Sequence, residues 1–370
     1  MKILIVSEII AGKGHEKAAY SIAKAINTLG LTHDVKIVNL LSIVSKSVEK
    51  AINIIYITMI KRFPYLWHWM YKKESGFASV FKEVIANVIQ IRIQDFIESE
   101  KPDIVVATHP TGLGALSKLK RKYHYQLAAV FTDFHINSFW IHENIDFYFV
   151  PHDNFKDIMV KTYNVTDKKV FVTGIPIDPA FSNNKDSKEM SIESIKRNGE
   201  YFKILIMGGG LGLGGMNNII ESVNKIDDIP LKLVAVTGTN KKLYNHLIKQ
   251  KSSFKKPVEI MQFVDDIYSL MNNSHLLISK SGGLTVSEAL SVPIPLLIYK
   301  PIPGQEVQNL KFLIKNKSAI HVKNTEEIAY WIRYLYHKPK LYLNLIKREQ
   351  ILAKPDSSKE ISRILLEILV

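Results

Sequence analysis

Residues 203–215 of this 370-residue chain, KILIMGGGLGLGG, join a short apolar run to a glycine-rich turn. The run Lys203–Met207 has the length and composition of a buried strand, and a helix is expected after the turn, from Asn217 to about Ile226. A buried strand, a tight turn and a helix open a parallel α/β unit, because parallel strands need a crossover between them. The stretch therefore predicts a parallel sheet covered by helices.

The start of the chain has the same order of elements. Lys2–Val6 is an apolar run, a glycine-containing turn follows, and a helix is expected from about His15 to Leu29. Further short strands alternate with helical stretches after each opening. The fold class predicted is α/β, with two Rossmann-like, doubly wound domains facing a cleft. The other expected strands are Val35–Leu40, Asp103–Ala107, Leu127–Phe131, Phe147–Val150, Val170–Thr173, Leu231–Val236, Glu259–Phe263, Leu276–Ser279 and Ile294–Tyr299.

A polar segment separates the two halves. Residues 182–199 carry few large apolar side chains, which is typical of a linker. The predicted organisation is a first domain at 1–181, a linker at 182–200 and a second domain at 201–354. The last residues have an amphipathic helical pattern, and a C-terminal helix at 355–370 is placed to pack back on the first domain.

Composition limits the classes of protein that fit. The chain has no cysteine, which excludes disulfides, thiolate metal sites and a cysteine nucleophile. Its longest apolar stretches, 51–60 and 289–299, are shorter than the roughly 18–20 residues that span a bilayer. The formal net charge of +14 indicates an anionic partner. Because the basic residues are mostly lysine and no motif combines arginines with stacked aromatics, we expect no nucleic acid partner.

Both glycine turns are candidates for phosphate binding. Glycine lets backbone N–H groups approach a phosphate, and the start of the next helix adds partial positive charge. A dinucleotide site would also need an acid at the end of the second strand of its unit. Val236–Asn240 and Val38–Leu40 contain none, and the turn Gly12–Gly14 lacks the third glycine. The turns therefore favour a phosphate or substrate site without a dinucleotide, and a tight turn without a ligand is the alternative.

The most informative stretch is Ser279–Leu290, SKSGGLTVSEAL, with the later turn Pro303–Glu306. Each turn is expected at the carboxyl end of a strand, where open α/β sheets bind ligands. Glu288, one turn into its helix, can accept two hydrogen bonds from a ribose diol. Gln305 and Glu306 offer acceptors for sugar hydroxyls.

Motifs along nearly the whole chain carry a resemblance to a known family. They are Gly12-Lys13-Gly14-His15 with Ala18-Ala19, Thr132-Asp133-Phe134, Trp140, His142-Glu143-Asn144, Asp146, Thr173-Gly174-Ile175-Pro176, the glycine loop 208–215, the block Ser281–Glu288, and Pro303-Gly304-Gln305-Glu306 with Asn309. Together they resemble the monogalactosyldiacylglycerol synthases and the bacterial processive diacylglycerol β-glucosyltransferases. The lipid-linked N-acetylglucosaminyltransferase of peptidoglycan synthesis is more distantly similar.

The resemblance implies a GT-B fold, in which the first domain binds the acceptor and docks on the membrane and the second binds a UDP-sugar. It implies an inverting enzyme that moves a hexose, glucose or galactose, from the UDP-sugar to diacylglycerol or a glycosyl-diacylglycerol, making membrane glycolipid. It places His15 near the acceptor hydroxyl. The donor-binding residues expected are Gly209, Gly210, Gly212, Phe263, Ser281, Gly282, Gly283, Thr285, Glu288, Gly304, Gln305, Glu306 and Asn309.

An inverting transfer needs one base to take the acceptor proton. His15 follows a turn at the carboxyl end of a strand, and the usual pKa of histidine, near 6.5, suits this role. Asp133 ends another strand at the same edge and either orients His15 or is itself the base; His109 is the weaker candidate. The sequence has no Asp-x-Asp pair, so we expect no metal and no cofactor, with the helix start after Gly208–Gly215 holding the leaving diphosphate.

A stretch near residues 47–82 mixes an apolar helical stripe with aromatics and cations, as an interfacial anchor does. An ordinary core helix is the alternative. We expect a peripheral protein at the cytoplasmic face of the cell membrane, bound to an anionic surface. His142 and its neighbour Glu143 lack the spacing of metal ligands and are interpreted as acceptor-site or structural residues. The acceptor and membrane residues expected are Lys61, Arg62, Trp67, Trp69, His109, Trp140 and His142.

Other functions remain open at this point. One is a UDP-N-acetylglucosamine transferase acting on a polyprenyl-linked or other lipid acceptor. Another is a non-catalytic protein that binds sugar nucleotides or lipids, although His15, Glu288, Gln305 and Glu306 together argue against it. A nicotinamide oxidoreductase is disfavoured because the acids at the ends of the second strands are missing. The identity of the hexose, the number of sugars added and the oligomeric state do not follow from the sequence.

Overall fold

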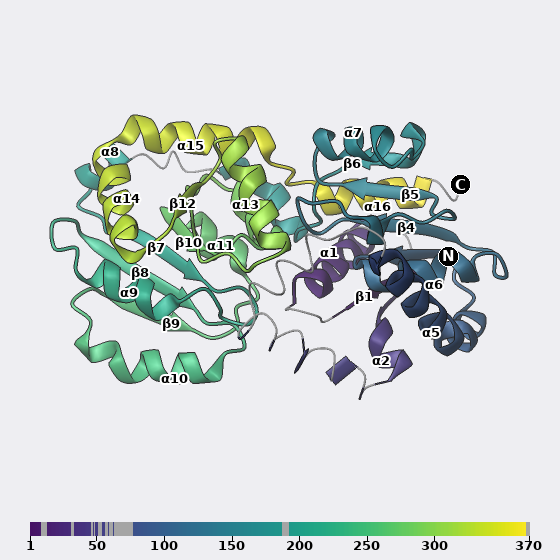
Figure 1. The fold of residues 1–370 in the computed structure, drawn as a ribbon. Coiled ribbons are helices and arrows are strands. Elements are labelled where there is room, and N and C mark those ends of the chain that lie inside the picture. The colour runs from purple at the N-terminus through teal and green to yellow at the C-terminus, as the bar shows by residue number, and fades with distance from the viewer. Residues whose placement is uncertain are drawn as a thin grey trace. The chain divides into compact units, whose positions relative to one another are not determined.

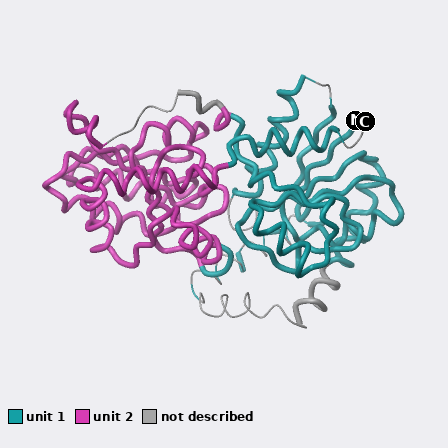
Figure 2. The backbone as a smooth tube through the Cα atoms, turned by 90° about the horizontal axis from the view of Figure 1, so that it is seen from above, with its two compact units in different colours: residues 1–179, 303–305, 354–370 teal, residues 180–302, 306–353 magenta. Residues whose placement is uncertain are grey.

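The computed structural model describes residues 1–8, 13–30, 33–45, 77–186 and 192–367, together with a few single residues between 47 and 62. The chain divides into two compact units, coloured teal and magenta in Figure 2. Each unit contains a six-stranded parallel sheet, which confirms the predicted α/β class. Unit 1 holds Met1–Pro179, Pro303–Gln305 and Lys354–Val370, and unit 2 holds Ala180–Ile302 and Glu306–Ala353.

The sheet of unit 1 has the strand order β2-β1-β3-β4-β5-β6. All four residues of β3 are buried, as expected for a parallel strand covered on both faces. The chain leaves β1 toward β2 on one side and later returns to β3 on the other, and such a switch point is where open α/β sheets bind ligands. The strands are β1 (Lys2–Ser7), β2 (Asp34–Asn39), β3 (Ile104–Ala107), β4 (Gln126–Val130), β5 (Phe147–Val150) and β6 (Val170–Val172).

The helices of unit 1 include the last helix of the chain. Apolar side chains of α1 and α16, among them Ile22, Ile26, Ile361 and Leu365, join one buried cluster with β1 and β3. Ser362 Oγ in α16 donates a hydrogen bond to the Ile22 carbonyl at 3.3 Å. Figure 1 shows α1 in purple and α16 in yellow beside the sheet. The helices are α1 (Gly14–Thr28), α2 (Leu40–Val44), α5 (Phe77–Glu100), α6 (Leu113–Leu119), α7 (Asp153–Lys161) and α16 (Ser357–Glu367), with 3-10 turns at Pro110–Gly112, Ser138–Trp140 and Asp167–Lys169.

The sheet of unit 2 has the order β12-β11-β10-β7-β8-β9, so its switch point lies between β7 and β10. Met207 pairs with Ser279 at the carboxyl ends of these two neighbouring strands. The turns that follow them are therefore adjacent in space. The strands are β7 (Phe202–Met207), β8 (Leu231–Val236), β9 (Val258–Met261), β10 (Leu276–Ser279), β11 (Leu296–Tyr299) and β12 (Ile320–Val322).

The helices of unit 2 cover this sheet. Ile328, Ile332 and Leu335 of α14 are fully buried and pack in the same cluster as Ile204 and Ile206 of β7. The helices are α8 (Ile192–Arg197), α9 (Met216–Asn224), α10 (Lys241–Gln250), α11 (Ile267–Asn272), α12 (Gly283–Leu290), α13 (Gln305–Lys315), α14 (Thr325–His337) and α15 (Pro339–Leu352), with 3-10 turns at Pro179–Asp186 and Lys251–Ser253.

Two details of the fold differ from the sequence-based expectation. The segment predicted as a linker, 182–200, ends in α8, whose Ile192 and Ile195 are buried in the core of unit 2. Two apolar side chains spaced three residues apart are enough to anchor one helical turn in a polar stretch. The strand β12 was not predicted, because it has only three residues and the central one is His321.

Candidate active site

The carboxyl ends of three neighbouring strands bring four side chains together in unit 1. Thr108 and His109 follow β3, Thr132 lies two residues beyond β4, and His15 is the second residue of α1. The rings of His15 and His109 meet edge to face, with centroids 4.5 Å apart. The structure thus places the predicted base and its weaker competitor in direct contact, at the switch point of the sheet.

The His15 ring is held by two groups that sequence analysis did not single out. Its Nδ1 lies 3.1 Å from the Thr108 carbonyl oxygen and 2.7 Å from Thr132 Oγ1. Because a carbonyl can only accept, this contact favours the tautomer with the proton on Nδ1, which leaves the lone pair on Nε2. Thr108 Oγ1 also donates to the backbone oxygen of His15 at 3.1 Å, which fixes the start of α1.

Both histidines are kept neutral by their surroundings. Desolvation lowers the pKa of His15 to about 4, against a smaller opposing effect of the bond to the Thr108 carbonyl. Desolvation also lowers the pKa of His109 well below its usual value, and the proximity of His15 adds to the effect. A neutral imidazole with a free Nε2 lone pair is the form in which histidine accepts a proton.

His109 also has a local structural role. Its Nδ1 accepts a hydrogen bond from the Thr111 backbone N–H at 3.3 Å and lies 2.9 Å from the Thr111 hydroxyl. It thereby caps the 3-10 turn at Pro110–Gly112. Because the Nδ1 of His109 accepts from a backbone N–H, the neutral ring carries its proton on Nε2 and has no lone pair there, which makes it a poorer base than His15.

Asp133 is half-buried at the end of β4, next to Thr132. In the described part of the chain, the hydrogen bonds of the His15 ring go to Thr108 and Thr132. Thr132, the neighbour of Asp133, thus contacts the His15 ring, and the orienting role of Asp133 stays a prediction. Its alternative role as the base stays a prediction.

Glu8 is a buried acid at the same edge that sequence analysis did not single out. Its side chain is 1% exposed, and its Oε2 accepts a hydrogen bond from the Leu41 backbone N–H at 3.3 Å. Among the described residues, Oε1 has no partner. Burial raises the pKa of Glu8 to about 8, so the protonated form predominates at neutral pH. An acid directly after an apolar strand was the signal that could have found it.

Two residues expected near the acceptor are packed into unit 1. Trp140 is 5% exposed and stacks on Phe131, with ring centroids 4.4 Å apart. His142 Nε2 lies 3.2 Å from the Phe139 carbonyl, and its ring fills the space beside Gly114, where a Cβ would lie 2.8 Å from His142 Cε1. The contacts of both side chains are those of scaffold residues, whereas a contact with the acceptor stays untested.

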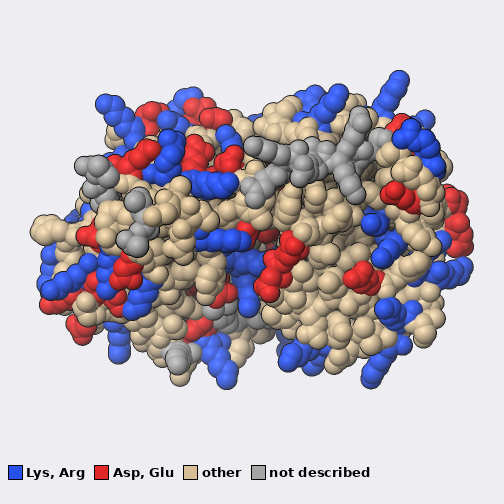
Figure 3. Space-filling view, turned by 180° about the vertical axis from the view of Figure 1, so that it is seen from behind, with Lys and Arg blue, Asp and Glu red and all other residues tan. Residues whose placement is uncertain are grey.

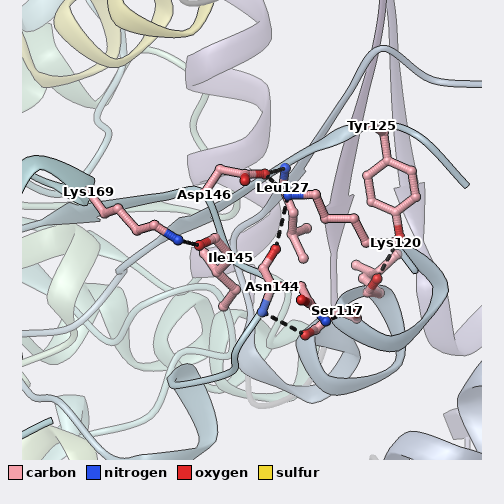
Figure 4. Close-up of polar contacts among 9 residues, drawn as sticks. Ser117, Lys120, Tyr125, Leu127, Asn144, Ile145, Asp146 and Lys169 are labelled. Atoms are coloured by element: carbon pink, nitrogen blue, oxygen red, sulfur yellow. Dashed lines mark hydrogen bonds and ion pairs between the residues drawn. The ribbon is translucent and has the colours of Figure 1, made fainter. Parts of the chain in front are cut away.

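Asn144 and Asp146, which belong to the same sequence motif as His142, lie at the opposite, amino-terminal edge of the sheet. Asp146 precedes β5, and its Oδ2 accepts hydrogen bonds from the Leu127 backbone N–H at 2.8 Å and from the Lys120 ammonium (Figure 4). Asn144 Nδ2 donates to the Ser117 carbonyl at 2.9 Å. These bonds tie the amino-terminal ends of β4 and β5 to α6 and the turn after it, away from the edge that holds His15. Their role is to hold the sheet in register.

In unit 2 the glycine loop 208–215 forms a tight bend over the end of β8. Gly209, Gly212, Gly214 and Gly215 have positive φ values, which favour glycine. A Cβ on Gly212 would lie 2.2 Å from the Thr237 carbonyl oxygen. The Gly210 carbonyl accepts hydrogen bonds from the backbone N–H and the hydroxyl of Thr239, both at 2.9 Å. Close backbone packing thus explains part of the glycine content of loop 208–215. The loop ends where α9 begins.

The turns after β10 and β11 are tied to each other through α13. Ser281 Oγ donates to the Glu306 carbonyl at 2.6 Å, and Asn309 Nδ2 donates to the Ser281 carbonyl at 2.9 Å. The Lys280 ammonium is ion-paired with Glu306 Oε1. Ser281, Glu306 and Asn309, which the sequence predicted as donor residues, therefore form one connected group, with the addition of Lys280.

The remaining predicted donor residues are placed as follows. Gly282 is the N-cap of α12, and Gly283 and Thr285 lie in its first turn. Glu288 is farther along the same helix and is 5% exposed. Gly304, with φ of +101°, precedes Gln305 at the start of α13. Phe263, in the loop between β9 and α11, is 38% exposed.

The predicted membrane residues Lys61, Trp67 and Trp69 lie outside the described residues, and Arg62 is an exposed helical residue. Among the described residues, no helix is long and apolar enough to span a membrane. The same residues hold no group of three or more His, Asp or Glu side chains arranged for a metal ion.

The charges of the described residues are partly paired. Lys24 binds Asp178 and Arg333 binds Asp228, each at 2.8 Å. On the face shown in Figure 3, Lys and Arg side chains are scattered among Asp and Glu.

Comparison with solved structures defines the class of fold. MnaA of S. aureus, in complex with UDP, has a TM-score of 0.64 at 18% identity, with 100% of this chain and 96% of that chain covered. MurG of Acinetobacter baumannii has a TM-score of 0.62 at 14% identity, covering 99% and 100%. The architecture is GT-B, with two Rossmann-like units.

Two family models match the two units. The monogalactosyldiacylglycerol synthase model matches residues 15–177, and the C-terminal domain of glycosyltransferase family 28 matches residues 203–355. The chain is thus a glycosyltransferase.

Curated relatives narrow the family. The processive diacylglycerol β-glucosyltransferase of Bacillus cereus strain G9842 is 30% identical over 288 residues, which cover 74% of this chain and 72% of the relative. The enzyme of the same name from Bacillus cytotoxicus is 26% identical over 362 residues, covering 96% and 91%. The chain belongs to the family of processive diacylglycerol β-glucosyltransferases.

Proposed function

We propose that this enzyme transfers glucose from a UDP-sugar to diacylglycerol, or to a diacylglycerol that already carries sugar, with inversion at the anomeric carbon. The names of the relatives support glucose and the lipid acceptor. The observation that carries the proposal within the chain is the His15 ring, whose Nδ1 lies against the Thr108 carbonyl, so that the proton sits on Nδ1 and the lone pair on Nε2. A base held in this way suits the activation of a lipid hydroxyl.

In the proposed step, His15 Nε2 accepts the proton of the acceptor hydroxyl. The hydroxyl oxygen forms a bond to the anomeric carbon, and the bond from that carbon to the diphosphate oxygen breaks. UDP leaves with the bonding electron pair. Attack opposite the leaving group inverts the configuration, so an α-linked donor sugar gives a β-linked product.

Unit 2 supplies the groups that bind UDP in this proposal. The backbone N–H groups of loop 208–215 and the start of α9 face the diphosphate, which such a helix start attracts. Glu288 binds the ribose hydroxyls, and Gln305 lies at the sugar. No metal or cofactor is needed in this scheme, so activity should be unchanged by EDTA.

The location follows from the acceptor. Diacylglycerol resides in a bilayer, so the enzyme must dock on one, and we place it at the cytoplasmic face of the cell membrane. The cations and aromatics of the segment around Lys61, Arg62, Trp67 and Trp69 suit an anionic surface. Nucleic acid has no part in the proposal.

The test is to incubate the full chain with vesicles of anionic phospholipid and diacylglycerol, supplying UDP-glucose, UDP-galactose or UDP-N-acetylglucosamine in separate reactions. Mass spectrometry of the lipid extract should show mono- and diglucosyl-diacylglycerol with UDP-glucose. A product formed only from UDP-N-acetylglucosamine and a polyprenyl-linked acceptor would replace the proposal by the peptidoglycan-like alternative. UDP binding without transfer to any lipid would favour a non-catalytic binding protein.

A further inference from the structure

Lys280 occupies a special place at the switch point of unit 2. It directly follows β10, and its side chain lies over the turn that follows the neighbouring strand β7. A Cβ on Gly209 would lie 2.8 Å from Lys280 Cε and 3.3 Å from its Nζ, and a Cβ on Gly282 would lie 3.3 Å from the same Nζ. Glycines in two separate turns therefore make room for one ammonium group.

The ammonium is paired with a buried carboxylate. Lys280 Nζ contacts Glu306 Oε1, and the side chains of Lys280 and Glu306 are 13% and 8% exposed. The other carboxylate oxygen, Oε2, accepts a hydrogen bond from the Ile302 backbone N–H at 2.8 Å. Both oxygens of Glu306 are thus already engaged within unit 2.

Stability alone does not account for this pair. A buried ion pair seldom stabilises a fold more than apolar side chains of similar size would, because both charges lose their hydration. The pair also lies at the carboxyl edge of the sheet, where ligands bind, and not in the apolar core. A cation held at this edge suits a role in binding an anion.

The surroundings of the ammonium favour a phosphate-bearing ligand. The glycine loop beside it leads into α9, whose first N–H groups attract anions. Lys300, after β11, lies beside the last residue of this loop: its Nζ would be 3.4 Å from a Cβ on Gly215. Two ammonium groups and a helix start therefore lie next to the loop.

We propose that Lys280 is the cation that neutralises the diphosphate of the donor, and that Glu306 is a positioning residue that holds Lys280 and does not contact the sugar. The proposal rests on the proposed function, because it assumes a nucleoside-diphosphate donor. It revises the role expected for Glu306 from the sequence, whereas Gln305 keeps its expected role at the sugar.

The experiment measures the affinities of the full chain for uridine, UMP, UDP and UDP-glucose by calorimetry. Removing Lys280 alone would leave Glu306 buried without its cation, so both residues are replaced together by Lys280→Gln/Glu306→Gln, which keeps the net charge. UDP affinity should fall roughly 10- to 100-fold, the effect of losing a hydrogen bond to a charged group, and UMP affinity should fall less. Uridine affinity should not change. Lys280→Arg, which keeps the charge, should bind UDP within a few-fold of the wild type.

The single variant Glu306→Gln distinguishes a carboxylate that positions Lys280 from one that contacts the sugar. If Glu306 acts through Lys280, the affinities for UDP and UDP-glucose change by the same factor. Lys311→Gln, an exposed lysine on α13, is the matched control and should bind all four compounds as the wild type does. Circular dichroism and thermal unfolding verify that each variant is folded.

Two results would overturn the inference while leaving the proposed function intact: wild-type UDP affinity in the double variant, or a loss of UDP-glucose affinity in Glu306→Gln with UDP affinity unchanged. A wild-type chain that binds neither UDP nor UDP-glucose would overturn the proposed function and the inference with it.

Discussion

The Nδ1 atom of His15 lies 3.1 Å from the carbonyl oxygen of Thr108, a residue 93 positions later in the chain. This contact links the start of α1 to the end of β3, and Thr132 at the end of β4 adds its hydroxyl to the same nitrogen. Because the partners of Nδ1 come from two strands of one sheet, the ring orientation is set by the rigid part of unit 1. With the proton on Nδ1, the lone pair that can accept a proton is on Nε2.

Thr132→Val should lower turnover by roughly tenfold, because valine keeps the shape of threonine but loses the hydroxyl that lies 2.7 Å from His15 Nδ1. UDP affinity should be unchanged, since the groups proposed to bind UDP belong to unit 2. Steady-state kinetics and calorimetry check the two parts. Thr132→Ser is the control and should retain turnover close to that of the wild type. Equal turnover in Thr132→Val and Thr132→Ser would show that the hydroxyl does not matter.

His15→Ala should lower turnover by roughly 10²–10⁴-fold, the range for loss of a general base, and leave UDP affinity nearly unchanged. The comparison variants are Asp133→Asn and His109→Ala, assayed under the same conditions. The smallest turnover should belong to His15→Ala. If Asp133→Asn is the more damaged variant, Asp133 is the base and His15 a supporting residue.

The pH dependence of kcat/KM should reflect the low pKa of His15. Burial holds this pKa at about 4, below the usual 6.5, so the ring is neutral and able to accept a proton throughout the range from pH 5.5 to 8. A base with an unshifted pKa would be only about one-tenth deprotonated at pH 5.5. Initial rates at low donor concentration should therefore be nearly constant from pH 5.5 to 7.5. A half-maximal rate near pH 6.5 would contradict this expectation.

Much of the fold could be predicted because buried parallel strands are short apolar runs between polar turns. Phe147–Val150, Leu231–Val236 and Leu276–Ser279 coincide with observed strands. The same rule could not find β12, since three residues with a histidine at the centre show no clear apolar run. The positions of helices and strands can be predicted from local sequence, except where an element is very short or interrupted by a polar residue.

The candidate site was predicted less completely. His15 could be found from its place after a turn, but Thr108 and Thr132 could not, because their contact with it depends on the strand order β1-β3-β4. The sequence also does not show which residues of a motif bind a ligand and which only hold the fold. Asn144 and Asp146 belong to the motif that carries the family resemblance, yet they bond at the amino-terminal edge of the sheet.

Glu349 leads to a prediction about stability. Its side chain is 1% exposed, its Oε1 accepts a hydrogen bond from the Leu296 backbone N–H at 3.1 Å, and its Oε2 has no partner among the described residues. Burial raises the pKa of this carboxyl well above its usual value of 4.5. The folded protein therefore keeps a proton that the unfolded chain releases.

The free energy of unfolding should thus fall as the pH rises above the unfolded pKa of Glu349, by up to about 1.4 kcal/mol per pH unit until the folded pKa is reached. Glu349→Gln keeps an oxygen acceptor for the Leu296 N–H and cannot ionise, so it removes this contribution. Urea unfolding at pH 5.5 and pH 8 should show the variant gaining stability relative to the wild type at the higher pH. Glu326→Gln, an exposed acid on α14, is the control and should show no such change. A stability difference between Glu349→Gln and the wild type that stays constant with pH would mean that Glu349 titrates at its ordinary pKa despite its burial.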